Sequence, residues 1–234
     1  MESTGAGRAR QRLTLFDLDN TLLAGDSDYG WAQFLIEAGV LDADAYERRN
    51  AEFFADYKAG RLDIHAFLDF QLRPLAEHDL SQLLAWRERF LVEKIRPMLL
   101  PAAQAIVAER LGAGDLVAVV TATNSFVTRP IAALHGIEHL VATEPETVAG
   151  RFTGRVSGEP CFQAGKLACV NTWLQGRQHR LGDFTASWFY SDSHNDLPLL
   201  DAITDPVAVD PDPILAEHAR RRGWPVVSWR EPHR

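Results

Sequence analysis

The first recognisable pattern in the chain is a short apolar segment that ends abruptly in polar residues. Leu13–Phe16 is mostly apolar and stops at Asp17. Segments of this length are typical of strands that are buried on both faces of a parallel sheet. Residues 1–12 precede this predicted strand and are rich in Gly, Ala and Arg, so we expect them to form a flexible N-terminus.

A helical periodicity replaces the strand pattern between residues 26 and 96. Large apolar residues from Trp31 to Ala38 are spaced at i, i+3, i+4 and i+7, with Ser27 as the predicted N-cap and Gly39 as the stop. Aromatic and leucine residues predict three further helices, within residues 46–57, 64–75 and 79–91. No segment in this block has a strand pattern, so we expect it to be entirely helical.

Beyond Pro97–Pro101, predicted strands and helices alternate along the chain. The strands fall within residues 116–120, 139–143, 188–190, 206–209 and 226–228, and the helices within 102–111, 126–134, 162–174 and 214–222. Thr147–Gly158 alternates with a period of two and contains three glycines, which indicates a small hairpin. Strand–helix alternation predicts a parallel sheet with both faces covered.

The fold class predicted from these patterns is therefore α/β. Because Leu13–Phe16 belongs with the later strands, the helical block interrupts the α/β domain rather than preceding it. The predicted division is a core made of residues 13–25 and 97–234, with an inserted all-helical unit at 26–96.

Polar residues gather where three of the predicted strands end. Asp17 and Asp19 follow the first strand, Thr121 follows the second, and the acidic segment Asp192–Asp196 follows the strand at 188–190. Lys166 lies at the start of the helix before that last strand. Ligands of open α/β sheets bind outside the carboxyl ends of the strands, so we expect these side chains to share one site.

These residue types suit phosphoryl chemistry at a hard metal ion. Several carboxylates at one site repel one another unless a cation lies among them, and oxygen ligands beside a phosphate favour magnesium, Mg²⁺. An aspartate can attack phosphorus and form an aspartyl-phosphate, while a second carboxyl group protonates the leaving oxygen. The Thr121 hydroxyl, the N–H groups after it and the Lys166 ammonium could hold the phosphate oxygens.

Composition narrows the functional classes. The chain of 234 residues is 46% hydrophobic and carries a formal net charge of −8, so we expect neither nucleic acid nor a membrane surface among its partners. Cys161 and Cys169 have no CxxC spacing and are expected to be free thiols of a reducing compartment. With no apolar leader and no membrane-length apolar run, we expect a cytoplasmic protein.

Four motifs in order resemble the haloacid dehalogenase superfamily, in its phosphoserine-phosphatase-like branch. They are DLDNT (Asp17–Thr21), VVTAT with Thr121, Lys166, and SDSHND with Asp192 and Asp196. The resemblance spans the chain from Leu13 to about Val209. It implies a Rossmann-like core with a helical cap inserted after the first motif, which matches the block at 26–96. It also implies a Mg²⁺-dependent phosphatase.

The resemblance assigns roles to the acidic residues. Asp17 is expected to be the nucleophile and a metal ligand, and Asp19 the general acid/base with its backbone carbonyl on the metal. Asp192 is expected to be a further metal ligand, and Asp196 to belong to the metal shell. The dehalogenases of the superfamily lack an acid at the position of Asp19, so the resemblance favours a phosphatase.

The resemblance also suggests how a substrate would bind. Thr121, Ala122, Asn195 and Lys166 are expected to hold the phosphate of a small phosphate monoester. In the cap, Asp26 is expected to bind an ammonium group.

A cap arginine, Arg73 or secondarily Arg96, is expected to bind a carboxylate. Phosphoserine and histidinol phosphate both remain plausible substrates, and histidinol phosphate would need Asp26 but not the arginine.

Two other functions remain open on the same residues. A phosphotransferase or mutase would pass the phosphoryl group from Asp17 to an alcohol, which product analysis with an alcohol acceptor would reveal. A non-catalytic phospho-switch would be labelled stably at Asp17 by acetyl phosphate without turnover. The hydrolase is the favoured interpretation, because receiver domains lack a large helical insertion after the first strand.

Overall fold

The computed structural model describes residues 11–58, 61 and 63–230. Most of the segment expected to be flexible, residues 1–10, lies outside the described residues.

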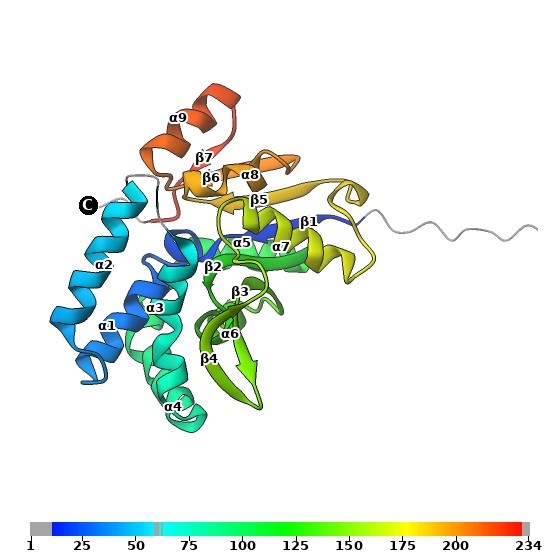
Figure 1. Cartoon of the computed structure of the whole chain (residues 1–234). Helices are drawn as coiled ribbons and strands as arrows, with labels where there is room; N and C mark the ends of the chain where they lie inside the picture. The colour runs from blue at the N-terminus through cyan, green and yellow to red at the C-terminus, as the bar shows by residue number, and fades with distance from the viewer. Residues whose placement is uncertain (1–10, 59–60, 62, 231–234) are drawn as a thin grey trace, which may run out of the picture.

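A seven-stranded sheet in the order β4-β3-β2-β1-β5-β6-β7 forms the centre of the molecule (Figure 1). Every neighbouring pair of strands is parallel except β3 and β4, which are antiparallel. The strands are β1 Leu13–Phe16, β2 Leu116–Asn124, β3 His139–Val148, β4 Arg151–Ser157, β5 Ser187–Ser191, β6 Asp205–Val209 and β7 Val226–Val227. The predicted α/β class is confirmed.

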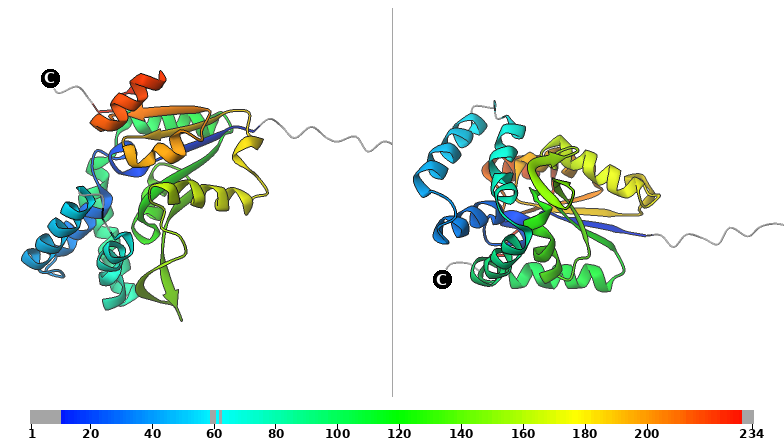
Figure 2. Two further views of the ribbon diagram at one scale, coloured as in Figure 1. Left: turned by 45° about the horizontal axis from the view of Figure 1, so that its top comes forward. Right: turned by 60° about the horizontal axis from the view of Figure 1, so that its bottom comes forward.

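Helices cover both faces of this sheet, as the two views in Figure 2 show. Successive residues of β1 illustrate the two faces, because Leu15 and Phe16 belong to different clusters of buried side chains. The cluster of Phe16 includes residues of α5 and α6, and the cluster of Leu15 includes residues of α7, α8 and α9. These helices are α5 Pro101–Gly112, α6 Ser125–Leu134, α7 Ala164–Gln175, α8 Leu197–Leu200 and α9 Pro213–Arg222.

The block predicted to be helical contains four α-helices and no strand among its described residues. They are α1 Ser27–Glu37, α2 Ala43–Lys58, α3 Ile64–Glu77 and α4 Leu80–Phe90, and two further helical turns extend α4 to Met98. The chain leaves the sheet and returns to it at one place, since Leu23 and Leu99 form an antiparallel bridge. The helical block therefore starts and ends at neighbouring positions beside the sheet, which leaves the sheet intact.

The N-cap of α1 is Asp26, so the prediction of Ser27 was wrong. The Asp26 carboxylate accepts hydrogen bonds from the backbone N–H groups of Asp28 and Tyr29, both at 2.9 Å. Ser27 is instead the first residue of the helix and is fully buried. Its own backbone N–H donates to Asp19, which leaves the cap position to the residue before it.

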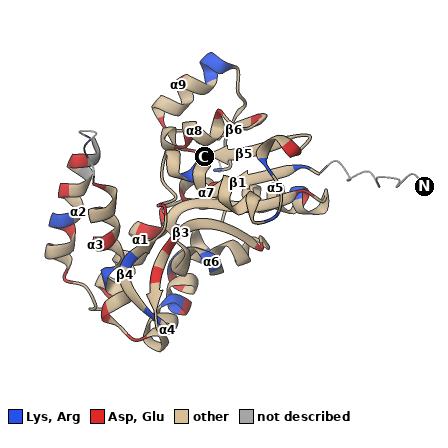
Figure 3. Ribbon diagram, turned by 45° about the vertical axis from the view of Figure 1, so that its right-hand side comes forward, with Lys and Arg blue, Asp and Glu red and all other residues tan. Residues whose placement is uncertain are grey.

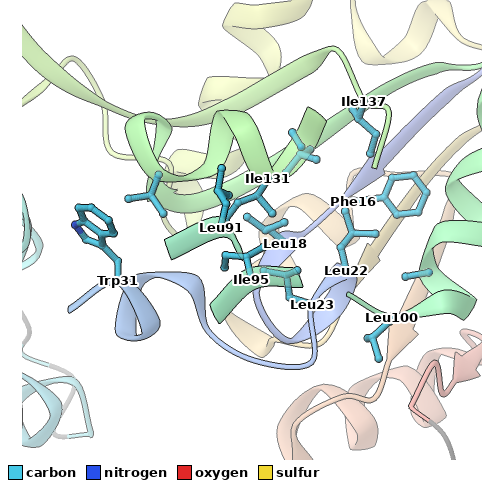
Figure 4. Packing of buried hydrophobic residues seen from close by; sticks show 14 of the residues in the cluster. Phe16, Leu18, Leu22, Leu23, Trp31, Leu91, Ile95, Leu100, Ile131 and Ile137 are labelled. Atoms are coloured by element: carbon cyan, nitrogen blue, oxygen red, sulfur yellow. The ribbon is translucent and has the colours of Figure 1, made fainter. Parts of the chain in front are cut away.

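The helical block and the sheet share one cluster of buried apolar side chains. Trp31 of α1 and Leu91 after α4 belong to the same cluster as Phe16, Leu18 and Leu22 (Figure 4). The aromatic rings of Trp31 and Phe126, from α1 and α6, meet at 6.1 Å between centroids. This shared burial holds the helical block against the carboxyl ends of the strands.

The β3–β4 hairpin also contacts the helical block. The predicted strand at 139–143 and the predicted hairpin at 147–158 form one continuous unit, because β3 runs on to Val148. Gly154 of β4 has a positive φ of 80°, and a Cβ added there would lie 3.2 Å from the Ala76 side chain of α3. A glycine therefore allows the close packing of the hairpin on α3.

The two cysteines are free, as predicted, and Cys161 is buried. Within the described residues, no helix is long and apolar enough to cross a membrane.

We expect His135, after α6, to make the fold sensitive to acid. Burial lowers its pKa from 6.5 to about 4, and neither ring nitrogen has a hydrogen-bond partner. As the pH falls below 6.5, His135 therefore becomes protonated in the unfolded chain but stays neutral in the folded protein. The stability that is present above that pH is lost as the pH falls toward 4. Denaturant unfolding measures the free energy of unfolding at pH 7 and at pH 5. The decrease in this free energy between the two pH values should be smaller by about 2 kcal/mol in His135→Gln than in the wild type.

The matched control is His65→Gln on the exposed face of α3. If both variants changed the pH dependence of the free energy of unfolding equally, His135 would not be the source of the acid sensitivity.

Candidate active site

A cavity of about 540 Å³ lies where the carboxyl ends of β1, β2 and β5 face the helical block. The sheet side contributes the polar residues predicted from the strand ends, and the helical side contributes residues of α1, α2 and α3. Figure 3 marks the acidic residues in red, including those at the start of α1. The described residues that line the cavity include six aspartates, and their only basic residue is a lysine: Asp17, Asp19, Asp26, Asp28, Asp192, Asp196 and Lys166.

Lys166 lies at the centre of the sheet side of the cavity. Its ammonium contacts a carboxylate oxygen of Asp17 at 2.7 Å and one of Asp196 at 2.8 Å, and all three side chains are buried. Burial alone would lower the pKa of Lys166, but the charges of Asp17 and Asp196 outweigh it and raise that pKa well above its usual value. Lys166 is therefore a fixed positive charge beside Asp17.

Thr21 links the carboxylates of Asp17 and Asp192. Its hydroxyl lies 3.3 Å from one oxygen of Asp17 and 3.2 Å from one oxygen of Asp192. Burial, followed by the charges of Asp17 and Asp196, raises the pKa of Asp192 to about 8, although Lys166 and Thr21 act in the opposite direction. A cation bound beside Asp192 would favour its charged form further.

Asp19 is held by two donors from different segments. The backbone N–H of Ser27 donates to one carboxylate oxygen at 2.6 Å, and the Thr123 hydroxyl donates to the other at 2.8 Å. Burial, followed by the charges of Asp26 and Asp17, raises the pKa of Asp19 to about 7. A carboxyl group in this state can both give and accept a proton near neutral pH.

Thr123 was not among the predicted site residues. The signal for it was its place two residues after Thr121, since alternate residues of an extended strand point to the same side.

The polar groups expected to hold an anion line the same side of the cavity. Thr121 is buried at the end of β2, and its hydroxyl accepts a hydrogen bond from the backbone N–H of Thr123 at 3.2 Å. Ala122 and Asn195 also line the cavity. The structure therefore brings Thr121, Ala122, Asn195 and Lys166 together, as predicted.

Gln163 was missed by the sequence analysis. Its side-chain amide donates to the Asn195 side chain at 3.2 Å, immediately before α7. Its backbone has a φ of 50° and a ψ of −121°, a strained conformation for a residue with a side chain. No periodicity or spacing in the sequence predicts this backbone conformation.

Arg73 does not reach the cavity, so its predicted contact with a substrate was wrong. It forms an ion pair with Glu77 at 2.9 Å on the outer face of α3, where 70% of its side chain is exposed. Its neighbour Leu72 lines the cavity instead, since consecutive helical residues point about 100° apart. Arg96 is likewise absent from the described lining.

His194 lies in the acidic segment, but its side chain contacts Asp212 rather than the carboxylates that line the cavity. Its Nδ1 lies 2.8 Å from the Asp212 carboxylate, which also accepts the His194 backbone N–H at 2.7 Å. Asp212 in turn caps α9, so this histidine connects the acidic segment to that helix.

Residues 14–201 match the sequence profile of the haloacid dehalogenase-like hydrolases. The chain is 42% identical over 221 residues to a protein named histidinol-phosphatase from Neisseria meningitidis serogroup C (strain 8013), covering 94% of this chain and 100% of that protein. It is 31% identical over 225 residues to phosphoserine phosphatase SerB1 of Mycobacterium tuberculosis (strain ATCC 25618 / H37Rv), covering 92% of this chain and 70% of that protein.

Solved structures agree with this fold. A protein of unknown function from Bordetella pertussis Tohama I matches with a TM-score of 0.90 and 49% identity, covering 95% of this chain and 100% of that one. A phosphoserine phosphatase solved as a phospho-aspartyl intermediate analogue matches with a TM-score of 0.65 and 20% identity, with 95% of each chain covered. The second likeness concerns the fold alone.

We expect Gly165→Ala to disturb the position of Lys166. A Cβ added at Gly165 would lie 2.1 Å from the backbone oxygen of Pro160, so the start of α7 must move. The free energy of unfolding should fall by about 1–3 kcal/mol, measured by denaturant titration.

The matched control is Gly112→Ala in α5, where an added Cβ meets nothing within 4 Å. This change should be neutral or slightly stabilising, because Ala favours a helix over Gly. Equal destabilisation by both substitutions would contradict the steric argument.

Proposed function

The chain belongs to the haloacid dehalogenase-like hydrolases and is a phosphatase, and we propose that it hydrolyses a small phosphate monoester that carries a cationic nitrogen, with histidinol phosphate as the leading candidate. The observation that carries this proposal is the charge of the cavity wall formed by the helical block. That wall contributes Asp26 and Asp28, and among its described residues it contributes no basic side chain. A substrate with a positive charge and no carboxylate fits such a wall.

The proposed nucleophile is Asp17. One of its carboxylate oxygens is bound by Lys166, which fixes the direction of the side chain and neutralises part of its charge. In the first step, a carboxylate oxygen of Asp17 bonds to phosphorus as the ester oxygen leaves, which gives an aspartyl-phosphate. Lys166 and Thr121 would hold the phosphoryl oxygens during this step.

The proposed general acid/base is Asp19. The pKa of about 7 allows it to carry a proton for the leaving alcohol oxygen in the first step. It would then remove a proton from the water that attacks the aspartyl-phosphate, which releases phosphate and restores Asp17. The hydrogen bonds from Ser27 and Thr123 hold the carboxyl group in place for both transfers.

The carboxylates near Asp17 fit a bound Mg²⁺. Asp17 and Asp192 share Thr21 between them, and burial, followed by the charges of Asp17 and Asp196, raises the pKa of Asp192, a cost that a bound cation would offset. No group of three or more acidic, histidine or cysteine side chains in the described residues forms a metal cage. Mg²⁺ is usually held by one or two carboxylates plus waters and substrate phosphate, so two carboxylates and the Asp19 carbonyl suffice.

When bound, Mg²⁺ would supply positive charge to the phosphoryl oxygens.

The role proposed for Asp196 differs from that of a direct metal ligand. One of its oxygens accepts hydrogen bonds from Lys166 at 2.8 Å and from the Ser191 hydroxyl at 2.7 Å. The geometry favours a positioning role, in which Asp196 holds the Lys166 ammonium beside Asp17.

The choice of substrate follows from what lines the cavity. A carboxylate of a substrate such as phosphoserine would need a basic partner, and Arg73 points away. The relative named histidinol-phosphatase is aligned over its whole length, which supports the same choice. The two free cysteines fit a cytoplasmic location, and the net charge of −8 fits a small-molecule substrate rather than nucleic acid.

The division into a core of residues 13–25 and 97–234 and a cap of 26–96 is part of this proposal. The bridge between Leu23 and Leu99 supports it.

Asp17→Asn should abolish turnover, because an amide cannot form the aspartyl-phosphate. Asp19→Asn should lower kcat by about 10²–10⁴-fold, the usual contribution of general acid/base help. Steady-state release of inorganic phosphate measures both, with Asp69→Asn on the exposed face of α3 as a control for loss of one charge. Near-full activity of Asp17→Asn would rule out the proposed nucleophile.

Wild-type protein should hydrolyse histidinol phosphate with a kcat/KM at least about 10-fold above that for phosphoserine, because an unpaired buried carboxylate costs more than 1 kcal/mol. Chelation of divalent cations should abolish both activities, and added Mg²⁺ should restore them. Preference for phosphoserine, or full activity after chelation, would contradict the corresponding part of the proposal.

A further inference from the structure

Asp28 is a carboxylate in the cavity that the proposed chemistry does not use. It is the second residue of α1, and it lines the cavity together with Tyr46 of α2 and Gln71 of α3. Its backbone N–H donates to Asp26. Its side chain takes part in none of the hydrogen bonds or ion pairs formed among the described residues, although it is half-buried.

One neighbour of Asp28, Tyr46, does not donate a hydrogen bond to it. The Tyr46 hydroxyl donates its only hydrogen to the Gln71 side-chain oxygen at 2.8 Å, so its oxygen faces the cavity as an acceptor. Burial, followed by the charge of Asp28, raises the pKa of Tyr46. The Tyr46 oxygen therefore offers an acceptor, and not a donor, in the cavity that Asp28 also lines.

Among the described residues, the charges that shift the pKa of Asp28 are negative. Burial, followed by the charges of Asp26 and Asp19, raises that pKa to about 8. The only basic residue among the described lining is Lys166, whose ammonium lies between Asp17 and Asp196. A carboxylate that is partly removed from water and unpaired destabilises the free protein, and a cation from a ligand would relieve that cost.

Asp26, which was expected to bind an ammonium group, is less suited than Asp28 to bind a cation. Its carboxylate already accepts two backbone N–H groups as the N-cap of α1, and it is exposed. Asp28 lies two residues further along the helix, where no backbone donor reaches its side chain.

We propose that Asp28, with the Tyr46 oxygen as a second acceptor, binds the cationic nitrogen of the substrate and thereby selects phosphate monoesters that carry an amine and no carboxylate. This inference rests on the proposed phosphatase function of the same cavity. Phe53 and Phe67 line the cavity beside this pair and give an apolar wall for the carbon skeleton between the nitrogen and the phosphate. Asp28 is thus a specificity residue at the opposite wall from Lys166.

The test is a ratio of two substrates measured on the full chain with Mg²⁺. One substrate is histidinol phosphate, which carries an amine, and the other is p-nitrophenyl phosphate, which carries no cation. The ratio of their kcat/KM values should fall by about 10–100-fold in Asp28→Asn and by a smaller factor in Tyr46→Phe. Asp44→Asn, an equal loss of charge on the exposed face of α2, is the control and should leave the ratio within about twofold of wild type.

A merely structural role of Asp28 would not move this ratio, because both substrates would lose activity together. Thermal melting adds a second readout. Since neutral Asp28 is favoured in the folded protein, its contribution to stability is lost as the pH rises toward 8, and Asp28→Asn should raise the Tm more at pH 8 than at pH 5.

The outcomes separate the two claims. Hydrolysis of both substrates with an unchanged ratio in Asp28→Asn overturns the role of Asp28 and leaves the phosphatase function standing. Absence of hydrolysis by the wild type overturns the proposed function.

The role of Asp28 is then decided by calorimetric binding of histidinol phosphate to Asp17→Asn, with and without Asp28→Asn. At least about 10-fold weaker binding in the double variant supports the role of Asp28, and equal binding overturns it.

Discussion

The buried ammonium of Lys166 between Asp17 and Asp196 is the interaction on which the site depends. Removing either carboxylate would leave the lysine with one partner, and removing the lysine would leave two buried carboxylates facing each other. Asp17 follows β1, Lys166 lies in α7 and Asp196 follows β5, so the three side chains can meet only because β1 and β5 are neighbours in the sheet. The absence of a side chain at Gly165 allows α7 to start close enough to the backbone of Pro160.

The second constraint is the shared apolar cluster between the helical block and the sheet. Trp31 and Leu91 pack with Phe16 and Leu18, which fixes the start of α1 above the end of β1. The same packing places the Ser27 N–H against Asp19, so the helical block takes part in orienting the carboxyl group that is proposed as the general acid/base. Burial of apolar surface therefore fixes the cavity wall of the helical block, which is proposed to select the substrate, relative to the residues that are proposed to react with it.

Much of the fold and of the sheet side of the site could be predicted from the sequence. Short apolar segments followed by polar residues locate strand ends, and strand ends in a parallel sheet lie together, so Asp17, Asp19, Thr121 and Asp192 meet as expected. The helical wall was harder to predict, because which residues face inward depends on the rotation of each helix about its axis. Arg73 and Leu72 are adjacent in sequence, yet only Leu72 lines the cavity.

Local hydrogen bonds explain the other differences. Asp26 appears in the sequence as a free acid, but the start of α1 uses it as a cap, and Asp28 has no side-chain hydrogen bond or ion pair within the described part of the chain. Gln163, which has a φ of 50°, donates a hydrogen bond to Asn195, which lies 32 residues away in the chain. These features depend on tertiary contacts that periodicity and spacing do not report.

The most direct test of the account is to identify the residue that carries the phosphoryl group during turnover. The protein is mixed with histidinol phosphate and Mg²⁺, quenched in acid, treated with borohydride to reduce any acyl phosphate, and digested for mass spectrometry. The account predicts a reduced side chain at Asp17 in this sample and none without substrate. A reduced carboxyl group at another aspartate, or a phosphoryl group on a histidine or serine, would contradict it.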